Sequence, residues 1–291
     1  MSDSAIEVDG LRKLYGDTVA VDGLDLTVRR GEIFALLGPN GAGKTTTVEI
    51  LEGYRRRDGG RVSVLGIDPA VVHGKRGTST DPTARRWRER VGIVLQGTGE
   101  FDELTVGEVV THFARFYPGA DDPARVIDRV GLSAKTRART HTLSGGQKRR
   151  LDVALGIVGR PELLFLDEPT TGFDPEARRE FWALIRDLAR GGTTVVLTTH
   201  YLQEAEALAD RVGVITAGRL IAVDTPQRLG DRDSALATVS WRTPEGSWES
   251  AQSATPTALV AELAARFGGE VPGLTVSRPT LEDIYLSMIT T

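Results

Sequence analysis

Continuous apolar runs recur along the chain, each bounded by polar residues, glycine or proline. The clearest runs are Ile33–Leu37, Val91–Leu95, Leu163–Leu166 and Thr193–Leu197. Runs of this length are typical of strands that are buried on both faces of a sheet. Helical patterns follow: Lys44–Leu51 comes directly after a glycine-rich loop, and Asp174-Pro175 supplies an N-cap and a first-turn proline. The pattern predicts an α/β fold.

Three further segments with their own patterns lie before the apolar run Leu163–Leu166. Ile6–Glu32 alternates between apolar and polar residues and predicts short strands with turns. Residues 73–83 are polar and rich in turn formers, which predicts a surface loop. Residues of about 104–156 predict a helical insert, which begins at the capping-box pattern of Thr105 and Glu108.

The composition changes near residue 230, where serine, threonine and proline become frequent. Helical spacing then returns in Thr257–Phe267 and in Leu281–Met288. We therefore expect two domains, a large one over 1–230 and a small accessory or regulatory one over 231–291.

Composition and charge narrow the class of protein. Of the 291 residues, 40% are hydrophobic and 26% charged, as in soluble globular proteins. The net charge of -4 indicates no general affinity for nucleic acid. There is no cysteine, which excludes disulfides and thiolate metal sites. Because the sequence also lacks a secretory signal and an apolar run of about 20 residues, a cytosolic location is expected, with any membrane association provided by a partner.

The glycine-rich segment after the first apolar run predicts a phosphate-binding loop. It fits the pattern G-x-x-x-x-G-K-[ST] with Gly38, Pro39, Asn40, Gly41, Ala42, Gly43, Lys44 and Thr45. Backbone N–H groups at the start of the following helix would surround a phosphate group. Lys44 would reach the β- and γ-phosphates of a nucleotide, and Thr45 would ligate Mg²⁺.

Polar residues at strand ends supply candidate chemistry beside this loop. Asp167 and Glu168 end an apolar run, so Asp167 could hold the Mg²⁺ shell while Glu168 orients or deprotonates an attacking water. Gln96 ends another run and could complete the metal shell with a neutral amide. His200 follows a fourth run, at the rim where open α/β sheets bind ligands, and could donate a hydrogen bond to the γ-phosphate. Taken singly, each could instead be an ordinary polar residue after a strand.

A second glycine segment begins a later helix. Ser144, Gly145, Gly146 and Gln147 form it, with Ser144 as a natural N-cap. Its exposed backbone suits anion binding, but the helical insert separates it from the first glycine loop. One way to use it is to present it to a nucleotide held by another copy of the chain.

The order of these segments resembles that of ATP-binding subunits of ABC transporters over roughly residues 6–230. The signature Leu143-Ser144-Gly145-Gly146-Gln147 is intact. The resemblance implies a P-loop NTPase core with an antiparallel β-subdomain and a helical subdomain, with ATP and Mg²⁺ as ligands. It also implies that Tyr15 stacks on adenine, that Thr46 joins the nucleotide site, and that Asp174, in the D-loop of residues 171–174, is a nucleotide-binding residue as well. In the family, two such domains hold two ATP molecules head to tail.

The C-terminal residues around Pro279–Tyr285 are similar to the extension of daunorubicin-type drug-export ATPases. That resemblance implies a small α+β C-terminal domain, a separate integral membrane permease, a location on the inner face of the membrane, and a drug-like, lipid or polysaccharide cargo. Two other functions stay open at this point. One is a soluble ABC-type ATPase acting on nucleic acid or ribosomes, although the acidic charge favours no nucleic-acid partner. The other is a module that senses ATP without turnover.

Overall fold

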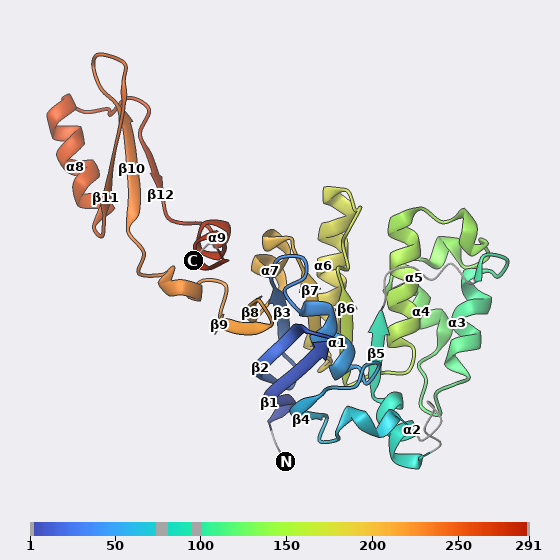
Figure 1. The fold of residues 1–291 in the computed structure, drawn as a ribbon. Coiled ribbons are helices and arrows are strands. Elements are labelled where there is room, and N and C mark those ends of the chain that lie inside the picture. The colour runs from blue at the N-terminus through green and yellow to red at the C-terminus, as the bar shows by residue number, and fades with distance from the viewer. Residues whose placement is uncertain (1–2, 74–80, 95–100, 290–291) are drawn as a thin grey trace. The chain divides into compact units, whose positions relative to one another are not determined.

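The chain folds into two compact units, Met1–Val223 and Asp224–Thr291. The computed structural model describes residues 3–73, 81–94 and 101–289 (Figure 1). The division follows Val223, near the boundary at residue 230 expected from composition. Among the described residues, no helix has the length and apolar character needed to cross a membrane.

A six-stranded sheet forms the centre of the first unit, in the order β5–β6–β7–β3–β8–β9. The bounds are β3 Ile33–Leu37, β5 Val91–Val94, β6 Leu163–Asp167, β7 Thr194–Thr199, β8 Arg211–Thr216 and β9 Arg219–Asp224. Strands β5, β6, β7, β3 and β8 run parallel, and β3 is buried along its whole length. The apolar runs are therefore buried strands, which confirms the α/β prediction.

A smaller antiparallel sheet in the order β2–β1–β4 supplies the other half of the core. Its strands are β1 Ser4–Tyr15, β2 Thr18–Arg29 and β4 Gly59–Val64. The expected short strands of the N-terminal region are thus two strands of 12 residues each. Their inward side chains, such as Leu11 and Val28, join Phe34 and Leu51 in one apolar cluster.

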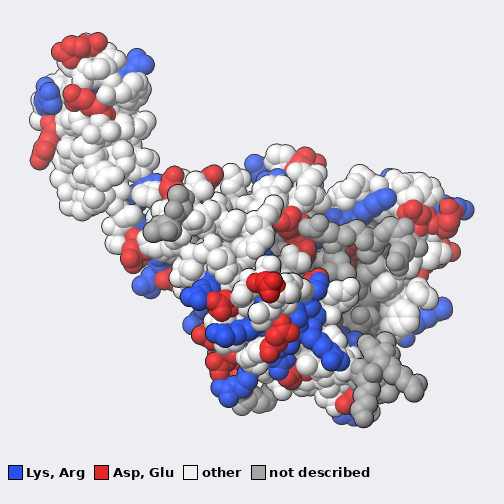
Figure 2. Space-filling view, viewed as in Figure 1, with Lys and Arg blue, Asp and Glu red and all other residues white. Residues whose placement is uncertain are grey.

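Charged side chains of both signs are interspersed over the outer face of this region (Figure 2). Lys13 pairs with Asp58 at 3.0 Å, and Arg57 pairs with Asp68 at 2.7 Å. Partly exposed pairs of this kind contribute about 1 kcal/mol or less each. They keep the surface polar rather than stabilise the fold appreciably.

Helices cover the central sheet and form the insert. The bounds are α1 Lys44–Leu51, α2 Pro82–Glu89, α3 Val106–Ala114, α4 Pro123–Arg129, α5 Gly145–Ile157, α6 Pro175–Arg190 and α7 Leu202–Leu208. Helices α3, α4 and α5 contact one another and form the predicted insert. The capping box of Thr105 and Glu108 is present at the start of α3. Figure 1 draws this helical group apart from the blue α1.

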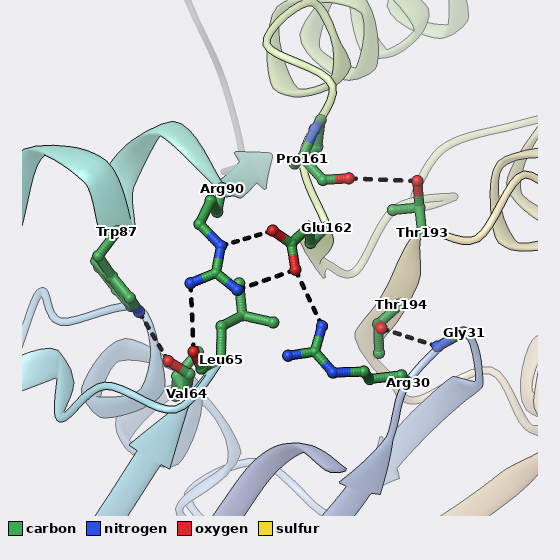
Figure 3. A network of polar contacts seen from close by, with 10 residues as sticks. All are labelled: Arg30, Gly31, Val64, Leu65, Trp87, Arg90, Pro161, Glu162, Thr193 and Thr194. Carbon is green, nitrogen blue, oxygen red and sulfur yellow. Dashed lines mark hydrogen bonds and ion pairs between the residues drawn. The ribbon is translucent and has the colours of Figure 1, made fainter. Parts of the chain in front are cut away.

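Helix α2 was not predicted, because its sequence is dominated by charged residues. Asp81 caps it by accepting a hydrogen bond from the Thr83 N–H, and Pro82 occupies the first turn. Trp87 is buried, and its Nε1 donates to the Val64 carbonyl at 3.0 Å (Figure 3). Trp87 and Ala84 are the two buried residues of this helix, and Trp87 is its one large apolar anchor.

A polar network ties together the amino ends of the central strands (Figure 3). Glu162, directly before β6, accepts hydrogen bonds from Arg90 Nε at 2.6 Å and Nη2 at 2.9 Å, and from Arg30 Nη1 at 2.9 Å. Thr194, at the start of β7, accepts one from the Gly31 N–H at 2.9 Å. These contacts join the segments that lead into β3, β5, β6 and β7.

The second unit is a three-stranded antiparallel sheet with a helix on one face. Its elements are β10 Ala237–Arg242, β11 Trp248–Ser253, α8 Pro256–Phe267, β12 Thr275–Ser277 and α9 Leu281–Ile289, with strand order β11–β10–β12. Val239, Trp241, Leu263 and Val271 form its small core. The two helices agree with the predicted positions, and the strands complete the α+β fold.

Candidate functional site

The glycine loop joins β3 to α1, and two of its glycines are required by space. A Cβ atom on Gly38 would lie 2.3 Å from the Ile215 carbonyl oxygen, and one on Gly43 would lie 2.4 Å from the Ala20 carbonyl oxygen. Gly43 also has a φ of 102° at the N-cap of α1. A larger side chain at either position would push the loop away from the sheet.

Lys44 bends back over this loop. Its Nζ donates to the carbonyl oxygens of Gly38 at 2.7 Å and Pro39 at 3.0 Å. Burial lowers the pKa of Lys44, and the nearby carboxylates of Glu168 and Asp167 oppose that shift. Lys44 therefore lies within electrostatic range of Asp167, the last residue of β6, and of Glu168, which follows it.

The two threonines after Lys44 start α1 with different exposure. Thr45 is exposed and Thr46 is half-buried. A threonine hydroxyl and the Asp167 carboxylate are oxygen ligands of the kind that Mg²⁺ prefers, and Mg²⁺ needs few protein ligands because it retains water. Among the residues that the structure describes, no group of three or more His, Asp or Glu side chains could hold a metal ion. A threonine hydroxyl and a carboxylate, together with phosphate oxygens, form a donor set that would fit Mg²⁺.

Both acids are held by Thr198 of the neighbouring strand. Asp167 pairs with Thr198 in the parallel register of β6 and β7. Thr198 Oγ1 donates to Asp167 Oδ1, while the Glu168 N–H donates to the Thr198 carbonyl at 3.0 Å and approaches Oγ1 at 3.3 Å. Thr198 is buried, and nothing in the sequence pattern pointed to it. Counting strand register from His200 would have found it.

Glu168 occupies a strained backbone position beside His200. Its φ is 43°, a left-handed conformation that non-glycine residues rarely adopt. Its Oε1 lies 3.1 Å from His200 Nδ1, and Thr171 Oγ1 donates to Oε2 at 3.4 Å. Such strain is often kept where the direction of a side chain matters for chemistry.

Tyr15 ends β1 with its ring partly exposed. Lys13 Nζ lies 5.4 Å from the ring centre, and Arg55 Cζ lies 5.3 Å from it. Stacking of this ring on adenine stays a prediction.

The second glycine segment starts α5 with a complete capping box. The Gln147 N–H donates to Ser144 Oγ at 3.3 Å, and the Ser144 N–H donates to Gln147 Oε1 at 3.1 Å. Ser144 and Gly145 are exposed at this helix start. Helix α5 belongs to the helical insert, separate from α1 in Figure 1.

Asp174 caps α6, as the sequence predicts. Its Oδ1 accepts hydrogen bonds from the N–H groups of Glu176 at 3.0 Å and Ala177 at 2.8 Å. The preceding Phe173 is buried against Phe181, with ring centres 5.6 Å apart. Gln96, the remaining predicted site residue, lies outside the described residues.

Two buried charged residues near the acids were also missed by sequence reasoning. Arg149 of α5 donates to backbone carbonyl groups on both sides of Glu168. Glu204 of α7 is fully buried and accepts a hydrogen bond from Trp182 Nε1 at 3.3 Å, and its burial raises its pKa. Their positions depend on contacts between distant elements, which periodicity does not reveal.

Comparison with known proteins gives the family. A family model described as ABC transporter matches residues 21–171. Daunorubicin resistance ATP-binding protein DrrA3 of Streptomyces coeruleorubidus is 45% identical over 242 residues, which cover 80% of this chain and 73% of that protein. DrrA2 of the same organism is 37% identical over 319 residues, covering 99% and 96%. Nod factor export ATP-binding protein I of Ralstonia nicotianae is 42% identical over 229 residues, covering 77% and 68%.

Solved structures agree with this assignment. The cbiO1 protein of Clostridium perfringens, part of the ABC transporter complex cbiONQ, superposes with a TM-score of 0.68 at 28% identity, covering 78% of this chain and 90% of that one. An ATP binding subunit of an ABC transporter, at 21% identity and a TM-score of 0.69, shares the fold over 98% of this chain and 99% of its own. The chain belongs to the ABC transporter family and is one of its ATP-hydrolysing subunits.

Proposed function

We propose that two copies of this chain bind ATP and Mg²⁺ between them and that hydrolysis drives export through a separate membrane permease. The observation that carries the proposal is the convergence of Lys44, Asp167, Glu168 and His200 at the carboxyl ends of β3, β6 and β7. Ligands bind outside this edge in open α/β sheets.

The residues have distinct roles in the hydrolysis step. Backbone N–H groups of residues 38–46 and the Lys44 ammonium group bind the phosphates. Thr45, Asp167 and Gln96 would hold Mg²⁺, which neutralises phosphate charge when bound. Glu168 accepts a proton from the attacking water. His200, at 3.1 Å from the Glu168 carboxylate, orients that carboxylate and donates a hydrogen bond toward the γ-phosphate.

The second copy completes each site. The exposed N-terminus of α5, with Ser144, Gly145, Gly146 and Gln147, binds the nucleotide held by the partner's glycine loop in a head-to-tail dimer. Asp174 caps α6 and lies in the loop that faces the partner. Tyr15, whose side chain is exposed at the end of β1, stacks on adenine.

The names of the relatives support export as the work that hydrolysis drives. Two relatives are named for daunorubicin resistance and a third for Nod factor export. A drug-like, lipid or polysaccharide cargo fits both names. The chain would then act at the inner face of the membrane, bound to the permease, with residues 231–291 as an accessory or regulatory domain.

The exchange of Glu168 for glutamine tests the assignment of the general base. Glu168→Gln keeps the size of the side chain but cannot accept a proton, so hydrolysis should fall about 100-fold or more while ATP binding persists. Because ATP is then retained, the variant should form a stable dimer in ATP, measured by light scattering. Glu176→Gln, an exposed change in the first turn of α6, is the control. Hydrolysis by Glu168→Gln at the wild-type rate would show that another group is the base.

A further inference from the structure

Arg149 lies in the second turn of α5, and its guanidinium group is buried. The side chain leaves the helix whose first residues are the second glycine segment. Nη2 donates to the Asp167 carbonyl oxygen at 2.5 Å, and Nε donates to the Pro169 carbonyl oxygen at 3.2 Å. The two acceptors lie on either side of Glu168. One side chain of the signature helix therefore fixes both backbone flanks of the proposed general base.

The charges around the Arg149 guanidinium group favour keeping it at the two carbonyl oxygens. Burial lowers the pKa of Arg149, while the carboxylates of Asp152, Asp167 and Glu204 raise it. Asp152 Oδ2 lies 3.8 Å from Nη1. A guanidinium group stays charged in proteins and presents donors in a rigid fork. Moving it away from the two carbonyl oxygens would leave a buried charge without these partners, which is costly.

The segment that Arg149 holds includes a residue with a strained backbone. Glu168 has a φ of 43°, so its side-chain direction depends on how the two neighbouring peptide groups are held. The Asp167 carbonyl belongs to the peptide group directly before Glu168. The Pro169 carbonyl belongs to the second peptide group after it. A shift of α5 along its axis would pull on both. A small rotation of the Glu168 carboxylate would be enough to change hydrolysis.

We propose that Arg149 is a positioning residue that couples the signature helix to Glu168 of the same chain. When Ser144–Gln147 binds the nucleotide of the second copy, the position of α5 is passed through Arg149 to this copy's own hydrolysis site. Each chain thus senses the partner's nucleotide through one buried side chain. The proposal rests on the head-to-tail dimer proposed above.

Exchange of Arg149 for glutamine tests the coupling in the full-length chain. Arg149→Gln removes the charge and the fork, and kcat should fall about 10- to 100-fold. The KM and the Kd for a fluorescent ATP analogue should stay within about twofold of wild type, because Arg149 lies outside the phosphate loop. The Hill coefficient for ATP should fall from above 1 toward 1. Arg149→Lys keeps the charge but reaches one carbonyl at most, and should give an intermediate kcat with the fold intact.

The neighbouring arginine offers a matched control. Arg150 is on the same helix, but its guanidinium group contacts Glu180 and the Val130 carbonyl oxygen, neither of which flanks Glu168. Arg150→Gln should therefore leave kcat and the Hill coefficient unchanged. Equal kcat and Hill coefficients in Arg149→Gln and Arg150→Gln would overturn the proposal. So would a wild-type Hill coefficient of 1, or a loss of ATP affinity and melting temperature that parallels the loss of kcat in both Arg149 variants.

Measuring Glu168→Gln alongside separates the two proposals. Hydrolysis by Glu168→Gln at the wild-type rate would refute the assignment of the base. For the Arg149 variants, the quantity compared with wild type is the Hill coefficient for ATP. An inactive Glu168→Gln together with a fully cooperative Arg149→Gln would refute the coupling alone.

Discussion

At the scale of single residues, one buried hydroxyl group organises the acidic end of β6. Thr198 Oγ1 serves Asp167 as a donor and lies 3.3 Å from the Glu168 nitrogen. Hydrogen bonds to charged groups contribute about 1.5–3 kcal/mol, and leaving such a group unpaired costs more than the average bond. The carboxylate proposed to hold Mg²⁺ therefore depends on a residue of another strand.

Removing this hydroxyl should weaken the use of Mg²⁺. Thr198→Val keeps the shape of the side chain but cannot donate to Asp167, so kcat should fall about 10-fold and half-maximal activity should need more Mg²⁺. Thr198→Ser retains the hydroxyl group and is the matched control. ATPase rates across a Mg²⁺ titration measure both effects, and identical curves for the two variants would contradict the role of the hydroxyl group.

Glu52 should make stability depend on pH. Burial raises its pKa to about 8, with further contributions from Asp167 and Glu49. Its folded pKa lies above the ordinary value of 4.5, so between about pH 5 and about pH 8 the folded state keeps a proton that the unfolded state releases. The free energy of unfolding should fall across that interval and level off above it.

Glu52→Gln should lack this component, because the amide does not titrate. Urea unfolding at several pH values, with metal ions chelated, gives the comparison. Parallel pH profiles for the wild type and Glu52→Gln would show that the carboxyl group titrates normally.

At the scale of elements, α5 approaches β5 through two glycines. A Cβ atom on Gly92 would lie 2.3 Å from the Gly156 carbonyl oxygen and 2.9 Å from Leu164 Cδ1, and one on Gly156 would lie 2.7 Å from Val94 Cγ2. The helix that carries Arg149 therefore rests directly on the edge of the central sheet. This contact sets how closely α5 approaches the edge of the sheet.

Filling the contact should separate helix and sheet. Gly92→Ala forces its neighbours apart, and overpacking of this kind costs about 1–3 kcal/mol in the free energy of unfolding. Gly119→Ala is the control, because a Cβ atom there meets nothing within 4 Å. Urea unfolding measures the difference, and equal stability of the two variants would argue against close packing at this contact.

Prediction from sequence succeeded for elements whose signal is local. The buried strands and the capped helices α3 and α6 follow from apolar runs and cap residues. Helix α2 was not predicted because its one large apolar residue, Trp87, lies among arginines. Strands β10–β12 were not located because serine and threonine obscure the alternation of apolar and polar residues. Within the site, the motif residues were predicted, whereas Thr198 and Arg149 act through register and packing between distant segments.

At the scale of the whole molecule, the proposed dimer assigns the two glycine-rich helix starts to different composite sites. The glycine loop leads from β3 into α1, while Ser144 caps α5 in the helical insert. A head-to-tail pair would use both at once. Damage to one segment in one copy should then fall on a particular site of the pair.

A mixed dimer tests that expectation. Ser144→Arg should spare ATP binding by its own glycine loop, and should abolish hydrolysis in the homodimer because the large side chain blocks the anion-binding helix start. With one wild-type and one variant copy, hydrolysis should be lost at the site whose glycine loop belongs to the wild-type copy. Labelling each loop with a distinguishable nucleotide identifies the damaged site. Loss at the variant's own loop would contradict the head-to-tail arrangement.

The left-handed backbone of Glu168 limits which substitutions at this position can inactivate the protein without disturbing its fold. The residue at position 168 must suit the proposed proton transfer and, separately, the left-handed backbone of the turn. Asparagine and glycine suit the turn without the chemistry, glutamine copies the shape of the native side chain, and β-branched residues fit neither. In a library of all amino acids at position 168, one group should therefore lose hydrolysis but still fold, and a second group should also misfold. Abundance in the cell, scored beside activity, would reveal the backbone requirement independently of any nucleotide.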